Sequence, residues 1–516
     1  MSAVVTHDYA ILGGGPAGLQ LGHLLDRAGR DYVCFESAST PGAFFRHHPR
    51  HRRLLSINKV HTGVSDQEAS LRFDWNSLLS DRDDLRFGQW TDDYFPDADV
   101  YADYLESYAE RLGVDVRCGV DIVSVARDGD FVLTAADGSV RRARRVVVAT
   151  GLRRPHVPSI PGIEHGELYE DMPVDPAGFR GARVLIMGKG NSAFETANHL
   201  TPVAARIHVL SPQSVEMAWR THYAGHLRAV NNDFLDTYQL KSQNAVLDAH
   251  VERIERVGDE LAVSMRYEHA QGEVETLRYD RVLVCTGFRC DTDVFDASCT
   301  PALIPGGRLP QLTSEWESTS VPDLFFAGVL MASRDFKRSN SAFIHGFRYN
   351  VRALSRMLGV RYHGDGWPSD PVPSDPAALT ERLLERLNSS SALWQQFGFL
   401  CDVVTLDEGQ TRLYPELPVD HVLEADFPPG ERRLVVNLEF GPHQENPFHI
   451  VRTPDPAHAS QSTFLHPVLR IYDGTTLVSE HHVLENLLGE WRDADQHAEP
   501  LRAWLETVRK PLASVR

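Results

Sequence analysis

The chain has 516 residues, a hydrophobic fraction of 42% and a formal net charge of −19. This length exceeds what one hydrophobic core usually supports, so we expect more than one domain. The negative charge argues against a nucleic-acid partner, because binding phosphates requires a basic surface. No apolar run approaches the length of a membrane-spanning helix, so we expect no membrane partner.

The ends of the chain and its cysteines predict a compartment. No charged segment followed by an apolar one opens the chain, so we expect no secretory signal. The six cysteines are scattered rather than spaced like a disulfide framework, and no spacing suggests a metal site. A reducing cytoplasm is therefore the expected location.

The first glycine-rich turn lies near the start of the chain. A short apolar strand over residues 8–12 leads into Gly13-Gly-Gly-Pro-Ala-Gly18, then a helix over 19–28 and a strand over 31–35 that ends in Glu36. Strand, glycines, helix and acid in this order predict a dinucleotide site, with the pyrophosphate at the helix N-terminus and the acid on the ribose. The alternative is a glycine-rich turn that binds nothing. The residues assigned to the site are Gly13, Gly15, Pro16, Ala17, Gly18, Glu36 and Ser37.

A small antiparallel meander follows, with Asp-Gly turns near residues 128 and 137. It leads into an apolar strand over 146–149 that ends in Thr150-Gly151, which we also assign to the first nucleotide.

A second glycine-rich turn begins at Gly188. It follows a strand over 182–187 and precedes a helix over 194–200 and a strand over 206–210. That last strand ends in Ser211-Pro212 without a carboxylate, which favours NADPH over NADH, because a carboxylate would repel a 2′-phosphate. Arg220 or Arg206 is the expected partner of that phosphate, and a degenerate repeat that binds nothing is the alternative. The residues assigned here are Gly188, Gly190, Asn191, Ser192, Ala193 and Arg220.

The second half repeats the order of the first. Another meander leads into Val282-Leu-Val-Cys-Thr286-Gly287, whose last two residues we assign to the nucleotides. A polar cluster lies between the second glycine-rich turn and this meander. It either meets the nicotinamide or substrate or forms a solvated loop; its members are His222, Tyr223, Arg228, Asn231 and Asn232. The predicted domains are an FAD-binding domain over 1–165 and 288–362, an NADPH-binding domain over 166–287 and a C-terminal extension over 363–516.

The C-terminal third changes in composition. A proline-rich connection over 367–376 precedes predicted helices over 379–387 and 392–397, strands over 401–406 and 432–440, and a helix over 481–491. This α+β extension fits a lid, a homodimer surface or a partner platform. The fold class predicted for the whole chain is α/β, with two Rossmann-like dinucleotide-binding domains, for FAD and NADPH, and the α+β extension.

Particular segments resemble a known family. Ala149-Thr-Gly151, Cys285-Thr-Gly-Phe288 and Tyr94-Phe-Pro96 are similar to the two-dinucleotide-binding-domain flavoproteins, and among them to the class B flavin monooxygenases. A likeness over nearly the whole chain points to the FAD-dependent oxidoreductase domain-containing family, which includes an endoplasmic-reticulum flavoprotein associated with degradation. The segments that carry it include residues 50–59, 74–79, 345–349 and 464–467.

Two departures limit what the resemblance implies. The endoplasmic-reticulum protein has a signal peptide and a retention tail that we do not find here, so its degradation role is not carried over. The class B signature also has a histidine before the NADPH strand, and the corresponding region, residues 161–170, is shortened.

The resemblance implies a reaction. NADPH passes a hydride to the flavin, O2 adds at flavin C4a, and the peroxide transfers one oxygen atom to the nitrogen or sulfur of a small molecule. Asn58 is the implied donor beside the flavin edge, followed by Lys59, while Trp75 and Asn76 line the substrate pocket. Each of these four residues has packing or turn formation as its alternative role.

The FAD site is completed further along the chain. His345 opens a helix whose N-terminus faces the flavin pyrimidine, or else it only caps that helix. Gly328 ends the strand over 324–328, where related folds carry an aspartate and this chain has Val329.

Two other functions stay open. A reductase of the same fold is one, although no Cys-x-x-Cys pair is present to serve as a dithiol. A flavin-bound protein that recruits a partner through its C-terminal third is the other.

Overall fold

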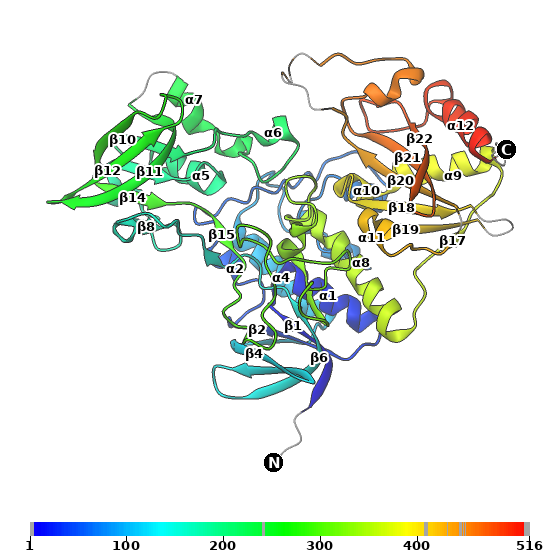
Figure 1. The fold of residues 1–516 in the computed structure, drawn as a ribbon, viewed down its shortest axis with the longest axis horizontal. Helices are drawn as coiled ribbons and strands as arrows, with labels where there is room; N and C mark the ends of the chain where they lie inside the picture. Colours follow the sequence, from blue (N-terminus) through cyan, green and yellow to red (C-terminus); the bar gives the residue numbers. More distant parts are fainter. Residues whose placement is uncertain are drawn as a thin grey trace.

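The computed structural model describes residues 5–239, 243–406, 411–430, 432–442, 446, 448 and 450–509. They form three lobes, with the N-terminal one at the base of Figure 1 and the other two rising on either side of it. In this described part of the chain, no helix is long and apolar enough to cross a membrane. The α/β fold class predicted from the sequence is confirmed.

The first lobe is built on a sheet of order β3-β2-β1-β6-β5-β4, with β16 paired to β6. β1 runs parallel to both β2 and β6, and Ile11 lies in register with Cys34 and Val147. Residues 9–12 of β1 are fully or almost fully buried, which is the pattern of a central strand covered on both faces. Its elements are β1 (Thr6–Leu12), α1 (Pro16–Arg27), β2 (Tyr32–Glu36), α2 (Phe44–His47), α3 (Gln67–Ser70), α4 (Ala98–Leu112), β3 (Val116–Cys118), β4 (Ile122–Asp128), β5 (Asp130–Ala135), β6 (Val140–Val148), β7 (Arg154–Pro155), β16 (Leu324–Phe326) and α8 (Ile344–His363).

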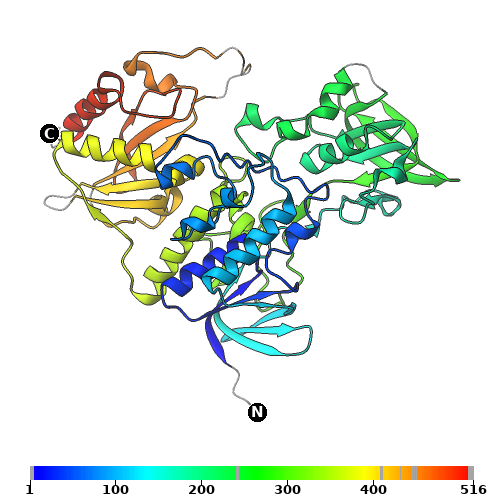
Figure 2. The ribbon, with the colours of Figure 1, turned by 180° about the vertical axis from the view of Figure 1, so that it is seen from behind.

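Three helices cover this sheet. α1 packs against both α4 and α8, and the view from behind shows them side by side in blue, cyan and yellow-green (Figure 2). The Gln20 side chain of α1 donates a 2.6 Å hydrogen bond to the carbonyl of Arg348 in α8. This layer fixes the N-termini of α1 and α8 relative to each other.

The second lobe repeats the parallel core in the order β13-β12-β11-β10-β9-β14-β8. The chain enters and leaves it through β7 and β15, which pair antiparallel and join the two lobes. Its elements are β8 (Glu167–Leu168), β9 (Arg183–Met187), α5 (Asn191–Leu200), β10 (Arg206–Ser211), α6 (Ala218–Thr221), α7 (Asp233–Gln239), β11 (Ala245–Val257), β12 (Glu260–Tyr267), β13 (Val274–Tyr279), β14 (Arg281–Val284) and β15 (Phe288–Arg289).

The C-terminal lobe is a sheet of order β17-β19-β18-β20-β21-β22, in which α9 packs against α12. Its α+β character agrees with the prediction. Its elements are β17 (Asp370–Pro371), α9 (Pro376–Ser389), α10 (Ser391–Gln395), β18 (Leu400–Thr405), β19 (Arg412–Pro418), α11 (Val419–Glu424), β20 (Arg432–Glu439), β21 (His466–Asp473), β22 (Thr476–His482) and α12 (Glu499–Arg509).

The helix predicted over residues 481–491 is wrong. β22 ends at His482, and the chain continues without a regular element to Arg492. Val483 and Leu484 are buried, while Leu487 and Leu488 are 80% and 76% exposed. In a helix, residues four apart would lie on the same face, so this division of burial is that of an irregular segment, and the left-handed Gly489 turns the chain away.

Buried polar contacts fasten the C-terminal lobe to the first lobe. Arg72 donates to the carbonyls of Leu387 and Ser390, and Gln395 donates to the carbonyl of Arg72 at 2.6 Å. The segment after α3 is thereby held between the two lobes.

Candidate functional site

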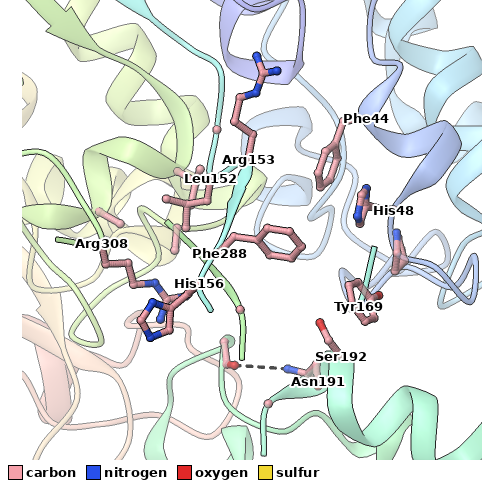
Figure 3. Close-up of a pocket in the computed structure, with 18 of the residues that line it drawn as sticks. Phe44, His48, Leu152, Arg153, His156, Tyr169, Asn191, Ser192, Phe288 and Arg308 are labelled. Carbon is pink, nitrogen blue, oxygen red and sulfur yellow. Dashed lines mark hydrogen bonds between the residues drawn. The ribbon is translucent and has the colours of Figure 1, made fainter. Parts of the chain in front are cut away.

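One cavity of about 1640 Å³ joins the glycine turns of the first and second lobes. Residues from both lobes point into it, including His48 of the first lobe, Asn191 and Ser192 of the second, and Phe288 of the connecting strand β15 (Figure 3). A ligand on one turn therefore faces a ligand on the other.

The first glycine turn leaves room for a ligand at one position only. A Cβ on Gly13 would lie 2.6 Å from the Ala149 carbonyl oxygen, and one on Gly18 would lie 2.0 Å from the Gly13 carbonyl oxygen. These two glycines serve backbone packing. At Gly15 nothing lies within 4 Å, so the backbone at the N-terminus of α1 is open to the cavity. Pro16 and Ala17 line the cavity beside it.

Glu36 stands at the cavity edge where β2 ends. One carboxylate oxygen accepts from the amide of Gly14 at 2.8 Å, and the other accepts from the amide of Ala38 at 2.9 Å. The free lone pairs of this fixed carboxylate are available for ribose hydroxyls. Ser37 also lines the cavity.

The strand ends and α8 complete the first site. Thr150, Gly151 and Gly328 line the cavity, and a Cβ on Gly328 would come within 2.9 Å of the Ala17 side chain. His345 lies in the first turn of α8 and is 1% exposed, yet neither ring nitrogen has a hydrogen-bond partner among the described residues. Burial, with smaller contributions from Arg348 and Arg228, holds its pKa well below the ordinary value, so the ring is neutral.

Trp75 packs on His345. The two rings stack with centroids 4.1 Å apart, and both line the cavity. Arg348, one turn further along α8, donates at 2.8 Å to the carbonyls of Leu71 and Ser77, on either side of Trp75. This buried arginine positions the segment that carries the indole.

These features fit FAD. The open backbone at Gly15 suits a pyrophosphate at a helix N-terminus, Glu36 suits a ribose, and the orphaned nitrogens of His345 suit a polar ring edge.

The second glycine turn has the same construction. A Cβ on Gly188 would lie 2.3 Å from the Cys285 carbonyl oxygen. A Cβ on Gly190, in contrast, would have no atom within 4 Å. Ser192 lines the cavity in the first turn of α5, and the buried Ala193 packs in the lobe core instead. This open helix N-terminus fits the pyrophosphate of a second dinucleotide.

Asn191 organises the loop that faces α5. Its side-chain nitrogen donates to the carbonyl of His226 at 2.9 Å, and its oxygen accepts from the amide of Arg228 at the same distance. Thr286 and Gly287 line the cavity across from this loop.

The end of β10 differs from the prediction. Arg220 is exposed and does not line the cavity, and Arg206 begins β10 at the opposite end of the strand. The cation there is Lys189, which donates to the Ser211 carbonyl at 3.1 Å and pairs with Asp248. The neighbouring strand β11 thus supplies the carboxylate that the sequence of β10 lacks.

Four other predicted residues do not reach the cavity. Asn58 is buried, and its amide donates to the Thr91 carbonyl at 2.7 Å; Lys59 is exposed. Asn76 donates to the Ile57 carbonyl at 3.0 Å, and His222 stacks on Phe440 of the C-terminal lobe. Tyr223 does line the cavity, where burial raises its pKa to about 12.

A pair that the sequence analysis missed lies beside the second turn. The Tyr169 hydroxyl donates to the Glu195 carboxylate, and both residues line the cavity. Burial raises the pKa of Glu195 to about 7, although the tyrosine hydrogen bond opposes that shift. Glu195 follows Asn191 by four residues in α5, so helical spacing could have placed it on the cavity face. Nothing in the sequence indicated Tyr169 as its partner.

Comparisons with known proteins agree with this geometry. A family model described as pyridine nucleotide-disulphide oxidoreductase matches residues 10–328. FAD-dependent oxidoreductase domain-containing protein 2 of Danio rerio is 36% identical, over 98% of this chain and 84% of that protein.

Solved structures share the fold of the first two lobes. A flavin-containing monooxygenase from Stenotrophomonas maltophilia has a TM-score of 0.53 at 21% identity and covers 69% of this chain and 98% of its own. A bacillithiol disulfide reductase from Bacillus cereus has a TM-score of 0.54 at 21% identity, over 69% of this chain and 100% of its own. A monooxygenase and a reductase fit equally well, so the fold does not select the reaction.

Proposed function

Because the chain belongs to the pyridine nucleotide-disulphide oxidoreductase family, as a relative of FAD-dependent oxidoreductase domain-containing protein 2, we propose that it is an NADPH-dependent flavin monooxygenase. Membership of this family makes the chain an FAD-dependent oxidoreductase, and the monooxygenase reaction is the proposal. The substrate we propose is a small molecule with an oxidisable nitrogen or sulfur atom.

One observation carries the proposal. A single cavity joins both glycine turns, and no cysteine pair lines it. All six cysteines are free thiols, and burial raises the pKa of Cys285, the one that reaches the cavity, above its ordinary value. Electrons taken from the nicotinamide therefore have no dithiol of this chain to enter, which supports transfer to a small molecule and O2.

The overall reaction balances without further reactants. NADPH, a proton, O2 and the substrate give NADP⁺, water and the oxygenated substrate. The nicotinamide loses a hydride and the nitrogen or sulfur loses two electrons, so O2 gains four. FAD, when bound, supplies the hydride acceptor and the place where O2 is activated.

Different residues of the chain would hold FAD, hold NADPH and exclude water from the space between them. Gly15, with the N-terminus of α1, and Glu36 would hold the FAD, and His345 would meet the edge of its ring system with a neutral imidazole. Gly190 and Ser192 at the N-terminus of α5 would hold the NADPH pyrophosphate. Trp75 and Tyr223 would exclude water from the space between the two ligands.

The proposed preference for NADPH requires Lys189 to offset the charge of the Asp248 carboxylate, which by itself would repel a 2′-phosphate. Lys189 lines the cavity at the end of β10, where its ammonium group donates to the carbonyls of Ser211 and Gln213 and pairs with Asp248. We propose that this cation meets the 2′-phosphate in place of the predicted Arg220. The cytoplasmic location and a homodimer remain predictions of the sequence.

Isotope incorporation tests the proposal. The FAD-reconstituted protein is mixed with NADPH, ¹⁸O2 and methyl phenyl sulfide or an arylalkylamine. We expect one ¹⁸O atom in the product for each NADPH oxidised, and a higher kcat/KM for NADPH than for NADH. NADPH oxidation without incorporation, together with reduction of a quinone or disulfide under anaerobic conditions, would establish a reductase instead.

A further inference from the structure

Arg228 is a cation in the cavity without a counter-charge. It follows α6 in the loop that Asn191 organises, and its backbone amide donates to the Asn191 side chain at 2.9 Å. Its side chain lines the cavity, and among the described residues no carboxylate lies within ion-pairing distance of its guanidinium. Burial lowers its pKa, which the Tyr94 hydroxyl only partly opposes. An unpaired charge that is partly removed from water is unfavourable until an anion joins it.

The guanidinium reaches across to the other lobe. Its central carbon lies 5.0 Å from the centre of the Trp75 ring, and its charge is felt by His345 on the same wall. The backbone of Arg228 thus belongs to the second nucleotide site, whereas its charge lies against the wall of the first. No atom of Arg228 lies within 4 Å of the point where a Cβ would be attached at Gly190, beside which a dinucleotide pyrophosphate would be held.

An aromatic wall continues from Trp75. His345 stacks on Trp75 and on Phe343, with centroids 4.1 Å and 5.6 Å away, and Phe343 is followed by Tyr223 at 5.5 Å. All four rings line the cavity. Such a wall suits the flavin and the apolar body of a substrate, and its four rings carry no positive charge, since the imidazole of His345 is neutral.

We propose that Arg228 is the anion-binding residue of the substrate site, and that the natural substrate is a small molecule that carries a carboxylate beside its oxidisable nitrogen or sulfur. A guanidinium that lies against an indole keeps its N–H edge free, and that planar edge matches the two oxygens of a carboxylate. This inference rests on the proposed function for the oxidisable atom, but the binding of the anion does not depend on turnover.

A matched pair of ligands tests the anion site. (Phenylsulfanyl)acetate and 2-(phenylsulfanyl)acetamide share the same phenyl ring and sulfide. They differ in charge, because the first ends in a carboxylate and the second in a neutral amide. Their dissociation constants are measured by calorimetry on the FAD-reconstituted protein with NADP⁺ bound. We expect the acid to bind about 10–100 times more tightly than the amide, which is the effect of a hydrogen bond to a charged group. Equal affinities would overturn the proposal without any variant.

Variants assign the effect to Arg228. Arg228→Gln should remove the preference for the acid and leave the affinity for the amide unchanged, while Arg228→Lys should retain part of the preference. Arg180→Gln is the control, because Arg180 is exposed in the same lobe and does not line the cavity. Absorbance of bound FAD verifies that each variant is folded.

Two outcomes separate this inference from its rivals. If Arg228→Gln weakens NADP⁺ binding and leaves the acid unaffected, Arg228 holds the nucleotide and the inference is wrong. If the acid preference depends on Arg228 but no sulfoxide forms with NADPH and O2, the anion site stands and the monooxygenase proposal fails.

Discussion

Gly15 lies at the N-terminus of α1 with no atom within 4 Å of the point where a Cβ would be attached. A side chain there would therefore not disturb the empty fold, and would occupy only the space into which the backbone opens. This separates a role in ligand binding from a role in folding, which is not possible at Gly13 or Gly18, where a Cβ would clash with backbone.

We expect Gly15→Val to fold and to lose FAD, because the valine blocks the approach of the pyrophosphate to the backbone. The measurement is the ratio of flavin absorbance to protein absorbance after purification, with circular dichroism to verify folding. Gly366→Val is the control, since Gly366 is exposed and equally free of neighbours. A variant that remains yellow would contradict the FAD assignment.

The residue type of Asn58 suggested a role in the reaction, whereas its surroundings indicate a role in stabilising the fold. Its amide joins the segment around residue 58 to the carbonyl of Thr91, and its backbone amide bonds to Tyr94 at 2.9 Å. We expect Asn58→Ala to lower the free energy of unfolding by about 1–3 kcal/mol, because the part-buried Thr91 carbonyl loses its donor.

The expected readout for Asn58→Ala is a lower melting temperature with unchanged FAD content and unchanged coupling of NADPH oxidation to product. Asp92→Ala, at an exposed neighbouring position, should change neither quantity. A loss of coupling at full stability would restore Asn58 to the reaction site.

At the scale of elements, α5 and the segment after β8 are joined by Glu195 and Tyr169. The pKa of Glu195 is raised to about 7 by burial, above the ordinary value of 4.5. Between these two values the folded protein holds a proton that the unfolded chain releases. The contribution of Glu195 to stability therefore decreases as the pH rises from 4.5 to 7, by about 3 kcal/mol in total.

Replacement by glutamine should remove this dependence, because the amide does not titrate. We expect the melting temperature of Glu195→Gln, relative to the wild type, to be higher at pH 8 than at pH 5. Taking the difference cancels buried histidines such as His48, whose pKa of about 4 gives a contribution of opposite sign. An equal difference at both pH values would show that Glu195 is ionised throughout.

At the scale of the whole molecule, one buried carboxylate forms ion pairs between the first and C-terminal lobes. Glu416 in β19 pairs with Arg352 and Arg356 of α8 at 2.6 and 3.0 Å, and with Arg386 of α9 at 3.3 Å. Burial alone would raise its pKa, but the three guanidinium groups hold it at about 2. Its contribution is therefore complete above about pH 4.5 and is lost as the pH falls towards 2.

We expect Glu416→Gln to destabilise the protein by about 3–5 kcal/mol, because the substitution leaves the half-buried Arg352 and Arg356 without a paired carboxylate, while Arg386 keeps Asp402. Limited proteolysis should then release the C-terminal lobe at a protease concentration that leaves the wild type intact. Glu385→Gln is the control, as its pair with Arg382 on α9 is exposed. Resistance equal to the wild type would show that the remaining contacts, including those of Arg72 and Gln395, hold the lobes together without Glu416.

Much of the fold could be predicted from local sequence patterns. The strands around each glycine turn and the helices after them lie within a few residues of their predicted bounds, because strand, turn and helix N-terminus follow one another directly in the chain. The helix predicted over 481–491 failed because its apolar residues are divided between the core and solvent, which only the position of β22 in the sheet determines.

The sequence by itself determined the two nucleotide turns, since each depends on contacts within about thirty residues of chain. Only the tertiary structure decided which side chains share the cavity. It removed Asn58, Asn76 and His222 from the predicted site and brought Glu195 to Tyr169 and Arg228 to Trp75. The physical reason is that a cavity between lobes is lined by segments far apart in the chain, and their approach is set by the packing of whole elements.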